Sequence, residues 1–269
     1  MVYLVQKKVF IVGKTYPNPS KRYRETTCIG GITDNGEWIR LYPVPFRHMN
    51  DQYKFRKYDW ITVDAKNDKD VWNRRESHKI VYTTIKIVEH VNAGSDKNWE
   101  KRNAIILPLL DENLEKLMEV RDNEHKSMGM IKVTKDNFNE IYTEERGIES
   151  DVDQITIDTI QKTLNGGTIS PLEIFPFKFK LDFYCCGEKC NGHKISCFDW
   201  EMLELYRNMR KKYDSDIAVN KVKEKIEWMF DQRDVYLMLG TEYKYNNFII
   251  GSIYYPPKMK IKPTQASLY

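Results

Sequence analysis

The sequence predicts an α+β protein: a β-rich, barrel-like N-terminal part, then a C-terminal part with two helices, a small antiparallel sheet and a Cys/His zinc knot. Two observations support this class. Strand-type runs dominate about the first hundred residues, whereas strand and helix patterns are mixed in about the last hundred. The 269 residues can bury one large core or two modest ones. We therefore expect a β-rich basic domain at 1–108, an acidic helical or linker segment at 109–170 and an α+β segment with the zinc knot at 171–269.

The N-terminal elements follow from apolar runs separated by turn residues. Asn35-Gly36 lies between two β-type runs, and an Asn-Gly pair in that position is a strong hairpin signal. The turn Pro43–Lys57 that follows begins with two prolines and cannot be helical at its start. The expected strands of this part are Val2–Val12, Thr26–Ile32, Trp38–Tyr42, Trp60–Ala65 and Lys79–Val88.

The second half mixes the two periodicities. Leucines and a methionine at helical spacing predict a helix over Leu110–Val120, and Asp199 is a plausible N-cap for a helix whose apolar face starts at Met202. Residues 144–170 are polar and contain Gly166-Gly167, which predicts a linker. The remaining expected elements are a helix at Ala218–Phe230 and strands at Ser127–Val133, Ile174–Tyr184, Val235–Leu239 and Phe248–Tyr254.

The cysteines gather in one short stretch. Cys186, Cys190, His193 and Cys197 stand at the spacing C-x3-C-x2-H-x3-C, which offers three thiolates and one imidazole, the ligand number of a closed tetrahedral zinc site. Cys185 can replace Cys186 in a C-x4-C-x2-H-x3-C alternative. Four protein ligands leave no position for water, so we expect a structural zinc ion. The chain lacks the H-x-E and P-C-x-x-C pair of zinc deaminases and the H-E-x-x-H of metalloproteases.

Charge is unevenly distributed along the chain. Residues 1–24 contain six lysines and arginines and no acid, whereas residues 109–160 contain fourteen acids and six bases. Such asymmetry indicates a polyanion site in one part, an acidic surface for a basic protein partner at 109–160, or two parts of the chain that attract each other.

Arginines and aromatic residues are interleaved in the basic N-terminal part, and both are used to bind nucleic acid, through phosphate contact and base stacking. We therefore expect a nucleic-acid-binding protein, for DNA or RNA, although rings of this kind can also belong to a core. Gly13-Lys14-Thr15 is not a phosphate loop, because the earlier glycine is missing and prolines follow. The candidate binding residues are Lys14, Lys21, Arg22, Tyr23, Arg24, Arg40, Tyr42, Phe46 and Arg47.

Two other classes of function stay open. The first is a metal-dependent nuclease or hydrolase acting on nucleic acid or nucleotides, with Asp64, Lys66, Glu76 and His78 as candidate catalytic groups and His193 only if the zinc ion has an open position. The second is a non-enzymatic accessory or interaction subunit.

No apolar run approaches the ~18 residues of a membrane span, the N-terminus lacks a signal-peptide pattern, and clustered cysteines suit a reducing compartment. The expected location is cytoplasmic.

Overall fold

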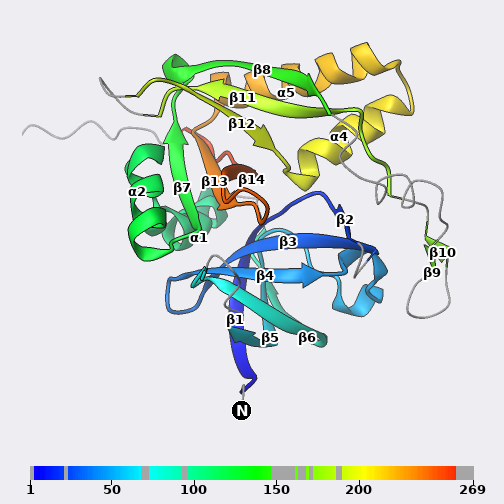
Figure 1. The fold of residues 1–269 in the computed structure, drawn as a ribbon, viewed down its shortest axis with the longest axis vertical. Coiled ribbons are helices and arrows are strands. Elements are labelled where there is room, and N and C mark those ends of the chain that lie inside the picture. The colour runs from blue at the N-terminus through cyan, green and yellow to red at the C-terminus, as the bar shows by residue number, and fades with distance from the viewer. Residues whose placement is uncertain are drawn as a thin grey trace, which may run out of the picture.

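The computed structural model describes residues 3–20, 24–67, 73–92, 96–146, 161–162, 168–169, 172–185 and 190–258. Over these residues the protein is α+β, with a five-stranded barrel, a second six-stranded sheet and helices that pack mainly on the second sheet (Figure 1). The predicted fold class is confirmed. No helix in the described ranges is long and apolar enough to cross a bilayer.

The barrel forms from the N-terminal strands. Its order is β1-β5-β6-β4-β3, a β1–β3 pairing closes it, and β2 extends the edge at β3. The β4–β6 pair is parallel and the other pairs are antiparallel. Gly36 has a φ of 75°, as a tight β3–β4 turn requires, so the expected hairpin is confirmed. The strands are β1 (Val5–Lys14), β2 (Asn18–Ser20), β3 (Arg24–Thr33), β4 (Trp38–Val44), β5 (Asp59–Asn67) and β6 (Ser77–His90).

Two helices, α1 (Asp96–Ile106) and α2 (Leu114–Glu124), connect the barrel to the second sheet. The predicted helix at Leu110–Val120 is present, but it begins later, because the Asn113 side chain accepts the backbone N–H of Lys116 at 2.7 Å as its N-cap. Leu110 therefore lies outside the helix and is 40% exposed. Figure 1 shows α2 beside strand β7 (Met128–Val133).

The second sheet has the order β7-β13-β14-β12-β11-β8, with β12 and β14 parallel and the other pairs antiparallel. Helices α4 and α5 pack on it, and the rings of Phe138 and Phe230 stack at 3.9 Å between β8 and α5. Strands β8 and β12 were not predicted from the sequence pattern. The further elements are β8 (Phe138–Glu145), β9 (Gln161–Lys162), β10 (Thr168–Ile169), β11 (Phe177–Phe183), β12 (His193–Cys197), α4 (Trp200–Arg210), α5 (Ser215–Gln232), β13 (Val235–Thr241) and β14 (Phe248–Tyr254).

The barrel and the second sheet share a buried seam. A hydrophobic cluster joins Phe10 and Val12 of β1 to Met238 of β13 and Tyr254 of β14. At its centre, β1 and β14 are in such close contact that a Cβ on Gly13 would lie 2.2 Å from Cβ of Ser252. Glycine at position 13 is therefore required for this approach.

Candidate metal centre and interdomain cleft

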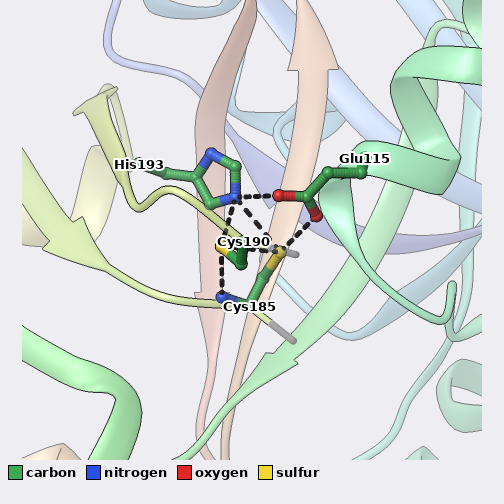
Figure 2. Close-up of side chains that lie close together, drawn as sticks. All are labelled: Glu115, Cys185, Cys190 and His193. Carbon is green, nitrogen blue, oxygen red and sulfur yellow. Dashed lines mark hydrogen bonds and ion pairs between the residues drawn. The ribbon is translucent and has the colours of Figure 1, made fainter. Parts of the chain in front are cut away.

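Four potential ligand atoms converge where the second sheet meets α2. The side chains of Glu115, Cys185, Cys190 and His193 each place one ligand atom within 4.8 Å of all the others. Figure 2 shows the Glu115 carboxylate and the His193 ring pointing toward each other beside the two thiols. His193 Nε2 lies 3.1 Å from Cys185 Sγ and 3.2 Å from Cys190 Sγ. We call these four residues the tetrad.

The separations within the tetrad are near those that a small ion imposes. Tetrahedral zinc with ordinary bond lengths places two sulfur ligands roughly 3.8 Å apart and a sulfur and a nitrogen ligand roughly 3.5 Å apart. The two sulfur atoms are 3.9 Å apart, and Glu115 lies 2.9 Å from Cys185 Sγ and 3.0 Å from His193 Nε2. An ion would need to move the ligands outward by only a few tenths of an ångström.

Different elements supply the four side chains. His193 begins β12 and pairs across the sheet with Phe183, the last residue of β11, and Cys185 lies two residues beyond Phe183. Glu115 comes from the first turn of α2. The backbone N–H of Leu114 also donates to Cys185 Sγ at 3.3 Å, which places the positive end of the helix dipole at this sulfur.

Without an ion, the site disfavours a thiolate. Burial, together with a hydrogen bond to the Glu115 carboxylate, raises the pKa of the Cys185 thiol above its usual range. A bound divalent cation reverses this preference, because coordination requires the deprotonated thiol and releases its proton. Metal affinity at the tetrad should therefore rise with pH.

The predicted ligand set is only partly reproduced. Cys190 and His193 belong to the tetrad, and Cys185 takes the position that the alternative spacing allowed. Cys186 lies outside the described residues. Cys197 lies four residues along β12 from His193, about 13 Å at the usual strand rise, and its side chain is 2% exposed in the core of the second sheet. Glu115 was not among the predicted ligands, because it lies 70 residues before Cys185.

A separate cleft lies between the barrel and the second sheet. It encloses about 480 Å³ and is lined from both sides. Its basic residues are Lys14, Arg56, Lys57, His90 and Arg102, and its rings are Tyr58, Trp99, Trp200 and Tyr255. Asp199 and Glu201 are its acidic residues. We call this region the interdomain cleft.

Some basic residues of the cleft already have partners in the protein. Lys57 donates to the carbonyl of Ile253 at 2.8 Å and to Glu201 at 3.2 Å. The Arg102 guanidinium donates to the carbonyl of Val91 and lies 3.7 Å from the Tyr58 ring centroid. The Arg56 side chain is 72% exposed, and its Nε lies 4.0 Å from Asp59 Oδ1.

Lys14 lies against rings rather than beside an acid. Its Nζ is 4.0 Å from the ring centroid of Phe46 and 5.2 Å from that of Trp200. Burial lowers the pKa of Lys14 to about 8, although Glu201, Asp59 and Asp199 oppose this shift. At neutral pH Lys14 still carries most of its charge, in an environment that solvates it poorly.

The other predicted nucleic-acid residues have varied positions. Arg40 is buried and donates to the carbonyls of Thr241 and Ser127, both at 2.9 Å. Arg47 forms an ion pair with Glu25 at 2.8 Å, and Phe46 is buried under Lys14. Tyr42 is 38% exposed. Residues 21–23 and the side chain of Arg24 lie outside the description.

The predicted catalytic residues do not line the interdomain cleft. Asp64 and Lys66 lie on β5, where their register partners on β6 are Val81 and Lys79. His78 Nδ1 lies 2.8 Å from the carbonyl of Glu76. Within the described ranges, the one group found that could hold a metal is the tetrad, which includes none of these four residues. Among the described residues, Asp64, Glu76 and His78 therefore do not form a group of possible metal ligands.

Two family models cover the chain. Residues 111–269 match the model described as a domain of unknown function, DUF8757, which spans more than half of the chain. The chain belongs to this family. Residues 5–108 match a second model, also described as a domain of unknown function, DUF8758. No curated protein matches the chain.

Proposed function

We propose that this protein binds nucleic acid in the interdomain cleft. The observation that carries the proposal is the lining of this cleft, where four lysines and arginines and one histidine surround four aromatic rings. Phosphates are held by such cations, and unpaired bases stack on such rings. A cleft of several hundred Å³ at a domain boundary is also a common position for a ligand site.

The proposal uses part of the predicted basic surface. Lys14 is one of the predicted binding residues, Arg56 lies in the turn Pro43–Lys57 of the same basic part, and both residues line the cleft. Phe46, expected to stack on a base, instead forms part of the support beneath Lys14. Arg40 would contribute to nucleic-acid binding only indirectly. Its guanidinium joins the barrel to the second sheet, which forms the other side of the cleft.

Fluorescence anisotropy with labelled single-stranded DNA and RNA tests the proposal. We expect affinity to fall steeply with salt, because each neutralised phosphate releases counterions. Arg56→Ala should weaken binding and reduce the slope of log K against log[salt] by about 1. Lys221→Ala removes an equally charged side chain from the outer surface of α5 and should change neither quantity. Salt-insensitive binding, or equal effects of the two substitutions, would contradict the proposal.

We also propose that the tetrad holds a zinc ion with a structural role. Two thiolates, one imidazole and one carboxylate fill a tetrahedral shell, and zinc accepts all three ligand types. Such an ion would connect α2, which follows the barrel, to the β11–β12 connection. The support is the convergence of four ligand atoms from two parts of the chain.

A further inference from the structure

An aspartate and a histidine form a pair at one edge of the interdomain cleft. Asp59 begins β5, His90 ends β6, and the two are register partners. His90 Nδ1 lies 2.5 Å from Asp59 Oδ1, while Asp59 Oδ2 accepts the backbone N–H of Arg56 at 2.7 Å. Asp59 is 0% exposed, whereas His90 lines the cleft.

This arrangement selects one tautomer of His90. An ionised carboxylate only accepts hydrogen bonds, so Nδ1 must carry a proton. In the neutral ring, Nε2 then holds the free lone pair and lies on the side of the ring away from Asp59. Nε2 is therefore suited to act as a general base toward a ligand in the cleft.

Lys14 supplies an acid in the same cleft. Its Nζ lies 3.4 Å from the carbonyl of Phe55 and rests on the Phe46 ring. Burial lowers the pKa of Lys14 to about 8, which makes its ammonium group a stronger acid than an ordinary lysine. Lys14 and Arg56 are also cations of this cleft, and positive charge beside a reacting phosphate would stabilise the extra negative charge of its transition state.

We infer that the interdomain cleft cleaves RNA by internal transesterification, with His90 as general base and Lys14 as general acid. His90 Nε2 takes the proton of a 2′-hydroxyl, and O2′ forms a bond to the adjacent phosphorus. The bond from phosphorus to O5′ breaks, and O5′ leaves with a proton from Lys14. The products are a 2′,3′-cyclic phosphate and a 5′-hydroxyl, and proton exchange with solvent restores both side chains.

The three acids near the cleft already have partners within the protein, and Glu201 accepts a hydrogen bond from Lys57 at 3.2 Å. Asp59 is occupied by His90 and Arg56, and Asp199 caps α4 while accepting the backbone N–H of Ile253 at 2.9 Å. Among the described side chains, the group of possible metal ligands is at the tetrad, in a different place. A 2′-hydroxyl provides a nucleophile within the substrate, so the reaction needs RNA and no second reactant. This inference rests on the proposed function, because RNA must first bind.

The test uses the full chain and labelled single-stranded RNA in a buffer without added divalent metal ions. We expect fragments ending in a 2′,3′-cyclic phosphate, no cleavage of the matching DNA, and no cleavage at a position bearing 2′-O-methyl. His90→Asn keeps a donor toward Asp59 but removes the base, and should slow cleavage by about 100-fold or more. Lys221→Ala, purified in the same way, should cleave at the wild-type rate. Asp59→Asn tests a positioning residue: its single-turnover rate should fall while its Kd for RNA stays within about twofold.

The outcomes separate the two proposals. Salt-dependent RNA binding without cleavage would overturn the catalytic inference and leave nucleic-acid binding supported. Equal cleavage by wild type and His90→Asn would identify a contaminating nuclease and also overturn it. Absence of RNA binding would overturn the catalytic inference, and absence of binding to both RNA and DNA would overturn both proposals.

Discussion

The carboxylate of Glu76 accepts hydrogen bonds from both the backbone N–H and the hydroxyl of Ser127, at 3.0 and 2.9 Å. Glu76 directly precedes β6 of the barrel, and Ser127 directly precedes β7 of the second sheet. Both side chains are buried. Sequence patterns placed Glu76 among candidate catalytic groups, whereas here it joins the two parts of the protein.

Glu76→Ala should therefore destabilise the protein. The substitution leaves the buried N–H and hydroxyl of Ser127 without their acceptor, and we expect the free energy of unfolding to fall by about 3 kcal/mol. Chemical denaturation followed by circular dichroism measures this change. Glu37→Ala removes an exposed glutamate from the β3–β4 turn and should change stability by less than about 0.5 kcal/mol. Similar effects of both substitutions would mean that the contact with Ser127 contributes little.

Nucleic-acid binding should depend on pH through Lys14. The pKa of Lys14 is lowered to about 8, so the side chain is charged below pH 8 and loses its proton above it. The acids facing it are Glu201, Asp59 and Asp199, and the neighbouring cation is Lys57. We expect affinity to weaken as pH rises from 7 to 9 at constant ionic strength. Lys14→Arg stays charged over this range and should flatten the curve; an unchanged curve would assign the pH dependence to another group.

The zinc content should depend on the residues of the tetrad and not on every cysteine of the cluster. Elemental analysis of purified protein should give one zinc ion per chain. Cys185→Ser and Cys190→Ser should lose it and lower the thermal unfolding midpoint, because the proposed ion would connect α2 to the second sheet. Cys186→Ser should keep the metal.

Cys197→Ser separates the tetrad from the ligand set that the spacing predicted. Its thiol is buried in an apolar core, so a hydroxyl there should destabilise the protein. The zinc content of the folded fraction should nevertheless stay at one ion. Loss of zinc in this variant would favour the set Cys186, Cys190, His193 and Cys197.

Local sequence patterns predicted most strands because apolar residues and turn signals lie within a few positions of each other. The β3–β4 hairpin and the helix capped by Asp199 are examples, and the cap is confirmed by a 2.9 Å bond from the Met202 N–H. Closure of the barrel could not be derived in this way. The β1–β3 and β4–β6 pairings are set by tertiary packing, which leaves no periodic signal in either strand.

The residues of the two sites differ in how well they could be predicted from the sequence. Cys190 and His193 are three residues apart, so their spacing alone indicated that they bind the same metal ion. Glu115 belongs to α2, which is distant in the sequence from Cys190 and His193. An acidic residue in the first turn of a helix is expected from the helix dipole alone, so Glu115 gave no separate indication of a metal ligand. Asp59 and His90 are 31 residues apart and meet only through the register of β5 and β6.

The close contact between Gly13 and Ser252 gives a direct test of the seam. Gly13→Ala would place a methyl group against Ser252 Cβ, and overpacking of this kind costs about 1 to 3 kcal/mol. Ser252→Gly removes the opposing Cβ and should recover most of that loss in the double variant. A double-mutant cycle of unfolding free energies measures the coupling, which should be clearly nonzero. Because β1 and β14 both contribute to the interdomain cleft, Gly13→Ala should also weaken nucleic-acid binding, and Ser252→Gly should restore it. Additive effects on stability would show that the cost of Gly13→Ala does not come from its contact with Ser252.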